Sequence, residues 1–201
     1  MRIILITGPS GSGKTFLANK LQKDINNTIS INTDSYYRDN LFIKFLSIFI
    51  IDIYDKLISV KVKELSQTIS SIYKNEQAIT FYKYDFKRKK STHLIKNLHT
   101  KTKFLIIEGI FSHRIDINYK ITLNILCKEN KEICYERRLK RDKLERGRNK
   151  KDVLRKFTKS WDLYYKNLIS YINKNDIHEI KGIDSKSYKS LISKLTDIDS
   201  H

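Results

Sequence analysis

The chain has 201 residues, of which 40% are hydrophobic and 11% aromatic, and its formal net charge is +18. This length suits one α/β domain with a sizeable core, and this hydrophobic content excludes a wholly disordered chain. The positive charge favours anionic partners such as nucleotides, nucleic acid or a membrane surface. Lysines are spread along the whole sequence, however, so the charge predicts no specific nucleic-acid contact.

Apolar runs and helical periods alternate along the chain, which predicts an α/β fold with a parallel sheet. The predicted strands cover residues 2–7, 28–33, 78–81, 103–107, 120–126 and 176–180. The predicted helices cover residues 14–24, 55–73, 129–145, 150–171 and 185–195. Residues 87–101 are basic and polar and are expected at the surface. We find no linker or internal repeat, so residues 1–201 are expected to form a single domain.

Neither secretion nor membrane insertion is expected. Cys127 and Cys134 are too few for a disulfide framework or a zinc site, and we expect buried, reduced thiols in a cytoplasmic protein. The N-terminus enters an apolar run at once, without the layout of a signal peptide. The most apolar span, residues 41–54, contains Lys44 and Asp52 and is too short to cross a bilayer.

A glycine-rich motif follows the first predicted strand. Residues 8–15 read GPSGSGKT and fit the P-loop pattern, with a strand before the motif and a helix after it. Backbone N–H groups of such a loop bind phosphate oxygens, and the lysine would contact the β- and γ-phosphates. A chance glycine turn is the alternative, although three of the chain's six glycines lie in this motif. The predicted phosphate-binding residues are Gly8, Ser10, Gly11, Ser12, Gly13, Lys14 and Thr15.

Two carboxylates follow predicted strands and are candidates for chemistry. Asp34 comes after residues 28–33, at the edge of the sheet where ligands bind in open α/β folds. It could accept the proton of an acceptor hydroxyl during phosphoryl transfer. Glu108 follows residues 103–107 and could contact a Mg²⁺ ion that Thr15 also binds. Either carboxylate could instead cap a helix, and the sequence leaves both alternatives open.

Arginines are concentrated in one segment of a chain that otherwise prefers lysine. Five of the ten arginines lie between positions 137 and 148. The planar fork of arginine binds two phosphate oxygens, and neutralising charge on the moving group is central to phosphoryl transfer. Arg138 and Arg141 would share one helical face, whereas Arg146 and Arg148 flank a glycine that would let the chain hinge. A basic helix that only faces solvent is the alternative, but lysine would serve that purpose equally well.

Taken together, these segments resemble the uridine kinase and phosphoribulokinase group of P-loop kinases, and most of all uridine–cytidine kinases. The matching segments are GPSGSGKT at 8–15, TDSYYR at 33–38, IDIYD at 51–55, YDF at 84–86, IIEGIF at 106–111 and RRLKRDKLERGR at 137–148. The resemblance implies a P-loop NTPase fold with a central parallel sheet, helices on both faces and a mobile arginine-rich lid at about 137–150. It also implies transfer of the γ-phosphate of ATP or GTP, with Mg²⁺, to the 5′-hydroxyl of uridine or cytidine.

The resemblance also implies roles for individual residues. Asp34 matches the catalytic base, and Lys14 and Arg141 would act with it at the phosphates. Thr15 and Glu108 would bind the metal. The residues that would close over the ATP phosphates are Arg141, Arg146 and Arg148. The residues that would bind the acceptor are Asp34, Tyr37, Tyr84 and Arg138.

Two positions depart from the family pattern on the acceptor side. Phe49 stands where the family has an aspartate that holds ribose hydroxyls, and Lys89 replaces a histidine that helps to read the pyrimidine. Asp52 is the nearest substitute and is included among the predicted acceptor-binding residues. The acceptor could therefore be another small alcohol, such as a sugar phosphate, pantothenate, glycerate or a nicotinamide nucleoside.

Two alternatives fall outside the kinases, namely a basic nucleic-acid-binding protein and a nucleotide-binding module without catalysis. The chain contains no recognisable nucleic-acid-binding motif, and it keeps the candidate base, metal and arginine residues of a kinase. The expected partner is thus a small-molecule acceptor, with no specific nucleic acid and no membrane. The sequence leaves the formation of a homo-oligomer open.

Overall fold

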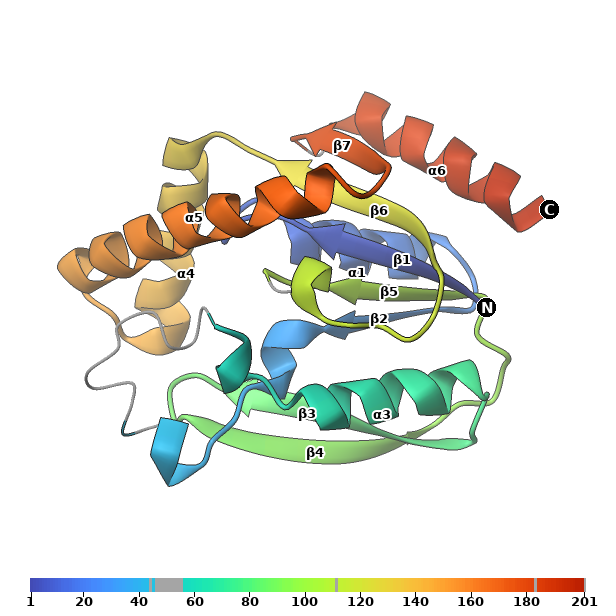
Figure 1. The fold of residues 1–201 in the computed structure, drawn as a ribbon, viewed down its shortest axis with the longest axis horizontal. Coiled ribbons are helices and arrows are strands. Elements are labelled where there is room, and N and C mark those ends of the chain that lie inside the picture. The colour runs from blue at the N-terminus through green and yellow to red at the C-terminus, as the bar shows by residue number, and fades with distance from the viewer. Residues whose placement is uncertain (44, 46–55, 111, 183, 201) are drawn as a thin grey trace.

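The computed structural model describes residues 1–43, 45, 56–110, 112–182 and 184–200 (Figure 1). The elements in chain order are β1 (Arg2–Thr7), α1 (Lys14–Asp24), β2 (Thr28–Asn32), η1 (Thr33–Tyr36), η3 (Leu57–Ser59), α3 (Val62–Tyr73), β3 (Ala78–Asp85), β4 (Lys90–Asn97), β5 (Phe104–Glu108), η4 (Ser112–Arg114), β6 (Ile121–Lys128), α4 (Lys131–Arg146), α5 (Lys150–Ile172), β7 (Ile177–Lys181) and α6 (Ser185–Ser200). The labels α and β denote helices and strands, and η denotes short 3₁₀ turns.

Five parallel strands form the central sheet, in the order β2-β5-β1-β6-β7. The middle strand β1 pairs with β5 on one side and with β6 on the other. Residues 3–7 of β1 and the whole of β5 are buried, as expected for parallel strands that are covered on both faces. The predicted parallel sheet is confirmed.

Helices cover both faces of this sheet, as Figure 1 shows. On one face, α1 and α6 form a core with β1, which includes Ile4, Ile6, Leu17, Leu21, Leu191 and Leu195. On the other face, α3 and α5 form a second core with the alternate residues of the same strands, including Ile3, Leu5, Leu65, Ile69, Tyr164 and Leu168. The helix α4 lies beyond the end of the sheet at which the parallel strands finish (Figure 1).

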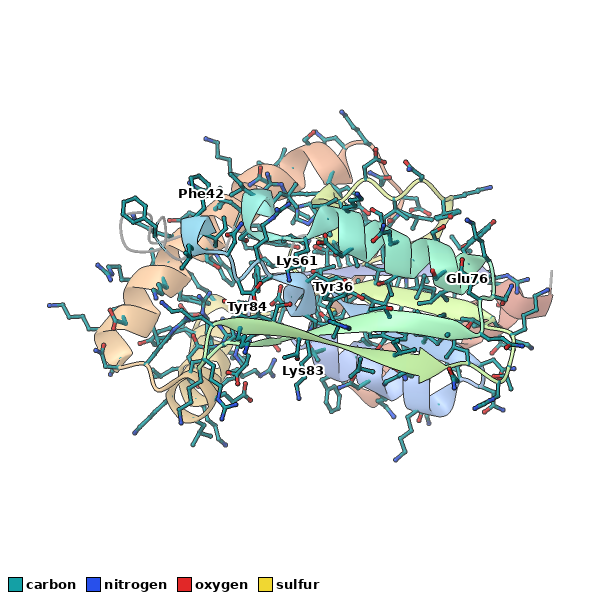
Figure 2. The ribbon with its side chains drawn as sticks, turned by 90° about the horizontal axis from the view of Figure 1, so that it is seen from below. Tyr36, Phe42, Lys61, Glu76, Lys83 and Tyr84 are labelled. Carbon is teal, nitrogen blue, oxygen red and sulfur yellow. The ribbon has the colours of Figure 1, made fainter. Side chains whose placement is uncertain are left out.

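A separate antiparallel hairpin of β3 and β4 lies beside α3 (Figures 1 and 2). The predicted strand at 78–81 is confirmed and extends to Asp85. Residues 87–101, expected only as surface, contain the strand β4, which is exposed along nearly its whole length. In Figure 2, Tyr84 of β3 lies toward the turn that carries Tyr36, whereas Lys83 lies on the opposite side of the hairpin. The hairpin thereby brings Tyr84 close to the turn η1 that follows β2 of the central sheet.

The helix α3 begins at Val62, so the predicted start at residue 55 is wrong. The apolar period continued through Leu57 and Ile58, but residues 57–59 form the short turn η3. The hydroxyl of Ser59 is buried there and donates a hydrogen bond to the Lys56 carbonyl at 2.7 Å. Val60 then pairs with Tyr37 in an isolated antiparallel bridge. This short irregular segment supports the backbone beside Asp34.

The two cysteines are free and buried, as predicted. Burial raises the pKa of Cys127 to about 12 and that of Cys134 to about 11, so both thiols keep their protons at neutral pH. Within the described ranges, no helix combines the length and the hydrophobicity that crossing a membrane requires.

Candidate active site

The P-loop connects the end of β1 to the start of α1, and its shape depends on its glycines. Gly11 and Gly13 both have φ of 92°, in the region that favours glycine. A Cβ at Gly11 would overlap the backbone carbonyl of Cys134 in α4, so the loop packs directly against that helix. Inside the loop, the Ser12 N–H donates to the Pro9 carbonyl at 3.2 Å. The loop therefore lies between the sheet and the arginine-rich helix.

A cavity of about 450 Å³ contains most of the predicted site residues. The predicted residues that line it are Ser10, Gly11, Gly13, Lys14, Thr15, Asp34, Tyr37, Tyr84, Glu108, Arg138, Arg141, Arg146 and Arg148. Gly8 and Ser12 belong to the loop but are not part of the cavity wall, and Ser12 is buried. The predicted acceptor residue Asp52 lies outside the described residues, as does Phe49. The cavity has the size of a small-molecule site.

The predicted metal residues Thr15 and Glu108 are in contact. The Thr15 hydroxyl donates to Glu108 Oε1 at 2.8 Å, so the carboxylate bonds a side chain and caps no helix. Glu108 ends β5 and is 2% exposed; burial raises its pKa to about 7, against the attraction of Lys14. Hydroxyl and carboxylate oxygens are the ligands that Mg²⁺ prefers, with phosphates and water completing its shell. The oxygens of this pair fit that ion as two of its ligands. Among the described residues, no group of three or more His, Cys, Asp and Glu is placed to hold a metal.

Binding of Mg²⁺ and nucleotide is expected to release a proton from Glu108. The pKa of about 7 means that much of the carboxyl group is protonated at pH 6.5, and a bound cation would favour the ionised form. Calorimetry at pH 6.5 in two buffers of different ionisation enthalpy measures this release. We expect more protons from the wild type than from Glu108→Gln, in which the nucleotide's own protons still titrate. Equal release from the two proteins would contradict a metal contact at Glu108.

The same pKa predicts how stability depends on pH in the nucleotide-free protein. Because burial raises the pKa of Glu108 from 4.5 to about 7, the folded state binds the proton more tightly than the unfolded state. The contribution of the protonated Glu108 carboxyl group to the free energy of unfolding is fully present below pH 4.5 and is lost as the pH rises through 7. Thermal unfolding at pH 5 and pH 8 should therefore show a smaller decrease in Tm for Glu108→Gln than for the wild type.

Asp34 lies at the start of η1, directly after β2. The Asp34 N–H donates to Asn32 Oδ1 at 2.7 Å, so Asn32 caps this turn and the capping alternative for Asp34 is wrong. The Asp34 carboxylate faces the cavity, and it accepts a long hydrogen bond of 3.4 Å from the Tyr37 hydroxyl. Its charge raises the pKa of Glu108 as a secondary cause, after burial. Asp34 thus lies near enough to Glu108 to influence its charge, and one of its oxygens contacts Tyr37.

Three aromatic rings line the part of the cavity that the sequence predicts to bind the acceptor. Tyr37 and Tyr84, both predicted, have ring centroids 5.5 Å apart in an edge-on arrangement. Phe86 contacts both rings, at 5.7 Å from Tyr37 and 5.1 Å from Tyr84. Sequence reasoning did not assign a role to Phe86, although it belongs to the YDF segment. Such a cluster can hold a flat ring by edge and face contacts.

The arginine-rich segment forms another part of the cavity wall and contacts these rings through Arg146 and Phe86. Arg141 Nη2 lies 3.4 Å from the Ser10 hydroxyl of the P-loop. Arg137, which sequence reasoning left without a role, donates to the Gly11 carbonyl at 3.3 Å. Arg138 is buried and donates to the Ser160 hydroxyl of α5 at 3.0 Å. The segment belongs to α4 and the connection to α5, and its movement as a lid stays a prediction.

A family model for the phosphoribulokinase and uridine kinase family matches residues 3–178 of the chain. The protein belongs to this family. A uridine kinase of Ureaplasma parvum serovar 3 is 32% identical over 178 residues, which cover 86% of this chain and 84% of the relative. A uridine kinase of Borrelia duttonii is 30% identical over 166 residues, covering 80% and 76% of the two chains. The family makes the protein an ATP-dependent kinase.

Solved structures show the same fold at lower sequence identity. The structure of the YGR205w protein aligns with a TM-score of 0.60 and 16% identity, and the alignment covers 90% of this chain and 85% of that protein. A structure described as a possible uridine kinase from Bacillus stearothermophilus aligns with a TM-score of 0.52 and 17% identity. The alignment covers 88% of this chain and 86% of that protein. The predicted P-loop fold, with a central parallel sheet and helices on both faces, is therefore confirmed.

Proposed function

We propose that this kinase transfers the γ-phosphate of ATP to the 5′-hydroxyl of uridine or cytidine. The observation that supports this proposal is that one cavity contains both the P-loop and a carboxylate beside an aromatic cluster. Lys14 and the loop would bind the phosphates, and Asp34 would accept the proton of the attacking hydroxyl. Tyr37 and Tyr84 would hold the base or sugar of the nucleoside. The relatives that carry the name uridine kinase support the choice of acceptor.

In this proposal, the arginines and the metal neutralise the charge on the moving phosphoryl group. Thr15 and Glu108 would hold Mg²⁺, and the ion would supply positive charge beside the phosphates. Arg141 lies next to the P-loop, Arg138 lines the same cavity, and Arg146 lines it against the Phe86 ring. Arginine forks in a partly dry site stabilise a spreading negative charge more strongly than they would in water. In this proposal, one cavity binds both the phosphate donor and the acceptor.

A second candidate is a kinase whose acceptor carries a negative charge, such as a sugar phosphate. Lys89, in the turn of the hairpin, and Lys156, on α5, both line the cavity. Burial lowers the pKa of Lys156, and the nearby charges of Arg148 and Lys89 lower it further. A site in which neighbouring cations lower the pKa of Lys156 is well suited to an anion. This observation favours a phosphorylated acceptor over other neutral alcohols.

A panel of acceptors with ATP or GTP and Mg²⁺ tests these proposals, with ADP or GDP release measured above the background without acceptor. Asp34→Asn protein purified in parallel controls for contaminating kinases. We expect turnover with uridine or cytidine, at a high KM because an apolar Phe49 stands at the family's ribose-binding position. If saturating uridine and cytidine each give no product while a sugar phosphate is turned over, that result would contradict the nucleoside proposal and support the second candidate.

A further inference from the structure

Four arginines of the candidate site converge on one buried aspartate, Asp142, to which no role has been assigned. Asp142 is fully buried on α4, and its oxygens lie 2.9 Å from Arg141 Nη2 and 2.8 Å from Arg148 Nη1. Its two other arginine partners, Arg138 and Arg146, place their Nε atoms 3.7 Å and 3.5 Å from it. All four arginines line the cavity, whereas Asp142 itself does not. A single carboxylate thus contacts every predicted phosphate- or acceptor-binding arginine.

The backbone of Asp142 also supports this arrangement. Its carbonyl accepts hydrogen bonds from the N–H groups of Gly147 and Arg148, the latter at 3.1 Å. Gly147 has φ of 63°, which ends α4 and turns the chain back toward the aspartate. Arg146 and Arg148, on either side of this turn, can therefore both reach the same carboxylate. The turn places both arginines near Asp142, and their ion pairs with Asp142 in turn stabilise the turn.

The aromatic cluster provides a further contact. The Arg146 guanidinium carbon lies 3.7 Å from the centroid of the Phe86 ring, a cation–π contact. Arg146 is thereby held between Asp142 of α4 and the β3–β4 hairpin. At the other end of the group, Arg141 contacts Ser10 of the P-loop. The arginines therefore extend as one group from the phosphate side of the cavity to its acceptor side.

Electrostatics explains why a carboxylate is needed at the centre of this group. Four guanidinium groups in a partly buried volume repel one another, and an isolated buried charge is strongly unfavourable. Burial alone would raise the pKa of Asp142, but Arg146, Arg141 and Arg138 outweigh it and lower the pKa, so the group stays ionised. One negative charge against four positive charges leaves the group strongly cationic. Asp142 therefore holds the arginines together without cancelling their attraction for phosphate.

We propose that Asp142 is a positioning residue that holds these four arginines as one preassembled cationic group facing the transferred phosphate. This inference rests on the proposed phosphoryl transfer and assigns Asp142 no contact with substrate. Replacing the carboxylate by an amide removes a negative charge beside the cavity, so nucleotide binding should stay equal or become tighter. Turnover should fall, because misplacing a group that stabilises the transition state by about 1 Å can lower the rate about a hundredfold.

The test compares Asp142→Asn and Asp142→Glu with a matched control, Asp152→Asn. Asp152 also pairs with an arginine, Arg155 at 3.4 Å, but the pair lies on the surface outside the cavity. Calorimetry gives the Kd for Mg²⁺ and ATP, and the fraction that binds nucleotide normalises kcat. ADP release is measured with uridine and also without acceptor, so that the second rate does not depend on the identity of the acceptor.

We expect kcat of Asp142→Asn to fall by more than threefold, on the order of tenfold, with a Kd no more than threefold weaker than that of the wild type. Asp142→Glu, which keeps the charge but moves the carboxylate by one bond length, should be intermediate, and Asp152→Asn should match the wild type. A smaller fall in kcat, or a Kd weakened more than threefold, would overturn the proposal. A merely structural defect would lower the fraction that binds nucleotide and leave kcat of the remaining molecules unchanged.

Two outcomes remain to be distinguished. If Asp142→Asn does not fold, the glutamate variant decides, and an unchanged kcat in that variant overturns the proposal. If the wild type releases ADP no faster with uridine or cytidine than without acceptor, the proposed acceptor is wrong. The acceptor-independent rate of the Asp142 variants still decides the positioning role in that case.

Discussion

Lys14→Ala is expected to reduce kcat by about a thousandfold and to weaken ATP binding. Lys14 is the first residue of α1, it is 8% exposed, and its ammonium group lies in the loop that surrounds the candidate phosphate site. The group donates to the Pro9 carbonyl at 2.9 Å, which directs it along the inside of the loop. Removing it would take away a cation that contacts the β- and γ-phosphates in this motif.

The measurement is ADP release at saturating acceptor, together with the Kd for ATP by calorimetry. Lys23→Ala is the matched control, because Lys23 lies on the same helix but is exposed and outside the cavity. Removing Lys14 also leaves the Pro9 carbonyl without this donor, so the thermal stability of both variants should be compared. Wild-type turnover in folded Lys14→Ala would contradict the assignment of the phosphate site.

The central sheet and the P-loop could be predicted because their sequence signals are local. An apolar run, a glycine-rich motif and a helix follow one another between residues 2 and 24, and the structure has the same order. The strand β4 gave no such signal. It pairs with one neighbour and is exposed on both sides, so neither burial nor alternation shaped its sequence. The start of α3 was misplaced because Leu57 and Ile58 continue the apolar period of the helix through a 3₁₀ turn.

The candidate site was predictable where a residue type itself carries chemistry, and less so where contacts between distant segments create it. Glycines, a lysine and carboxylates at strand ends point to phosphate binding by their types and positions. Asp142 gave no comparable signal, because one aspartate among arginines on a helix also fits a solvated face with ordinary ion pairs. Its role becomes visible only when the turn at Gly147 brings Arg148 back to it. Phe86 likewise gains its importance from Arg146, which lies sixty residues further along the chain.

Asp34→Asn is expected to reduce kcat by at least about a hundredfold, in the range of general-base catalysis. The amide keeps the size of the carboxylate and can still accept the hydrogen bond from the Tyr37 hydroxyl, but it cannot take a proton from the acceptor. The cap of η1 is also retained, because Asn32 provides it. ATP affinity should change little, since the P-loop and the arginines, rather than Asp34, are the residues proposed to bind the phosphates.

Kinetics at saturating ATP and acceptor, together with the Kd for ATP, provide the measurement. Asp39→Asn is the control, since Asp39 pairs with Lys61 at 3.3 Å and accepts a hydrogen bond from the Ser91 N–H, outside the cavity. That variant should lose stability while keeping its kcat per folded molecule. Asp34→Asn should show the opposite pattern, with nearly unchanged Tm and a large loss of kcat. If Asp34→Asn instead lowers Tm and keeps the kcat of the folded fraction, Asp34 serves the structure of η1, and another group must accept the proton.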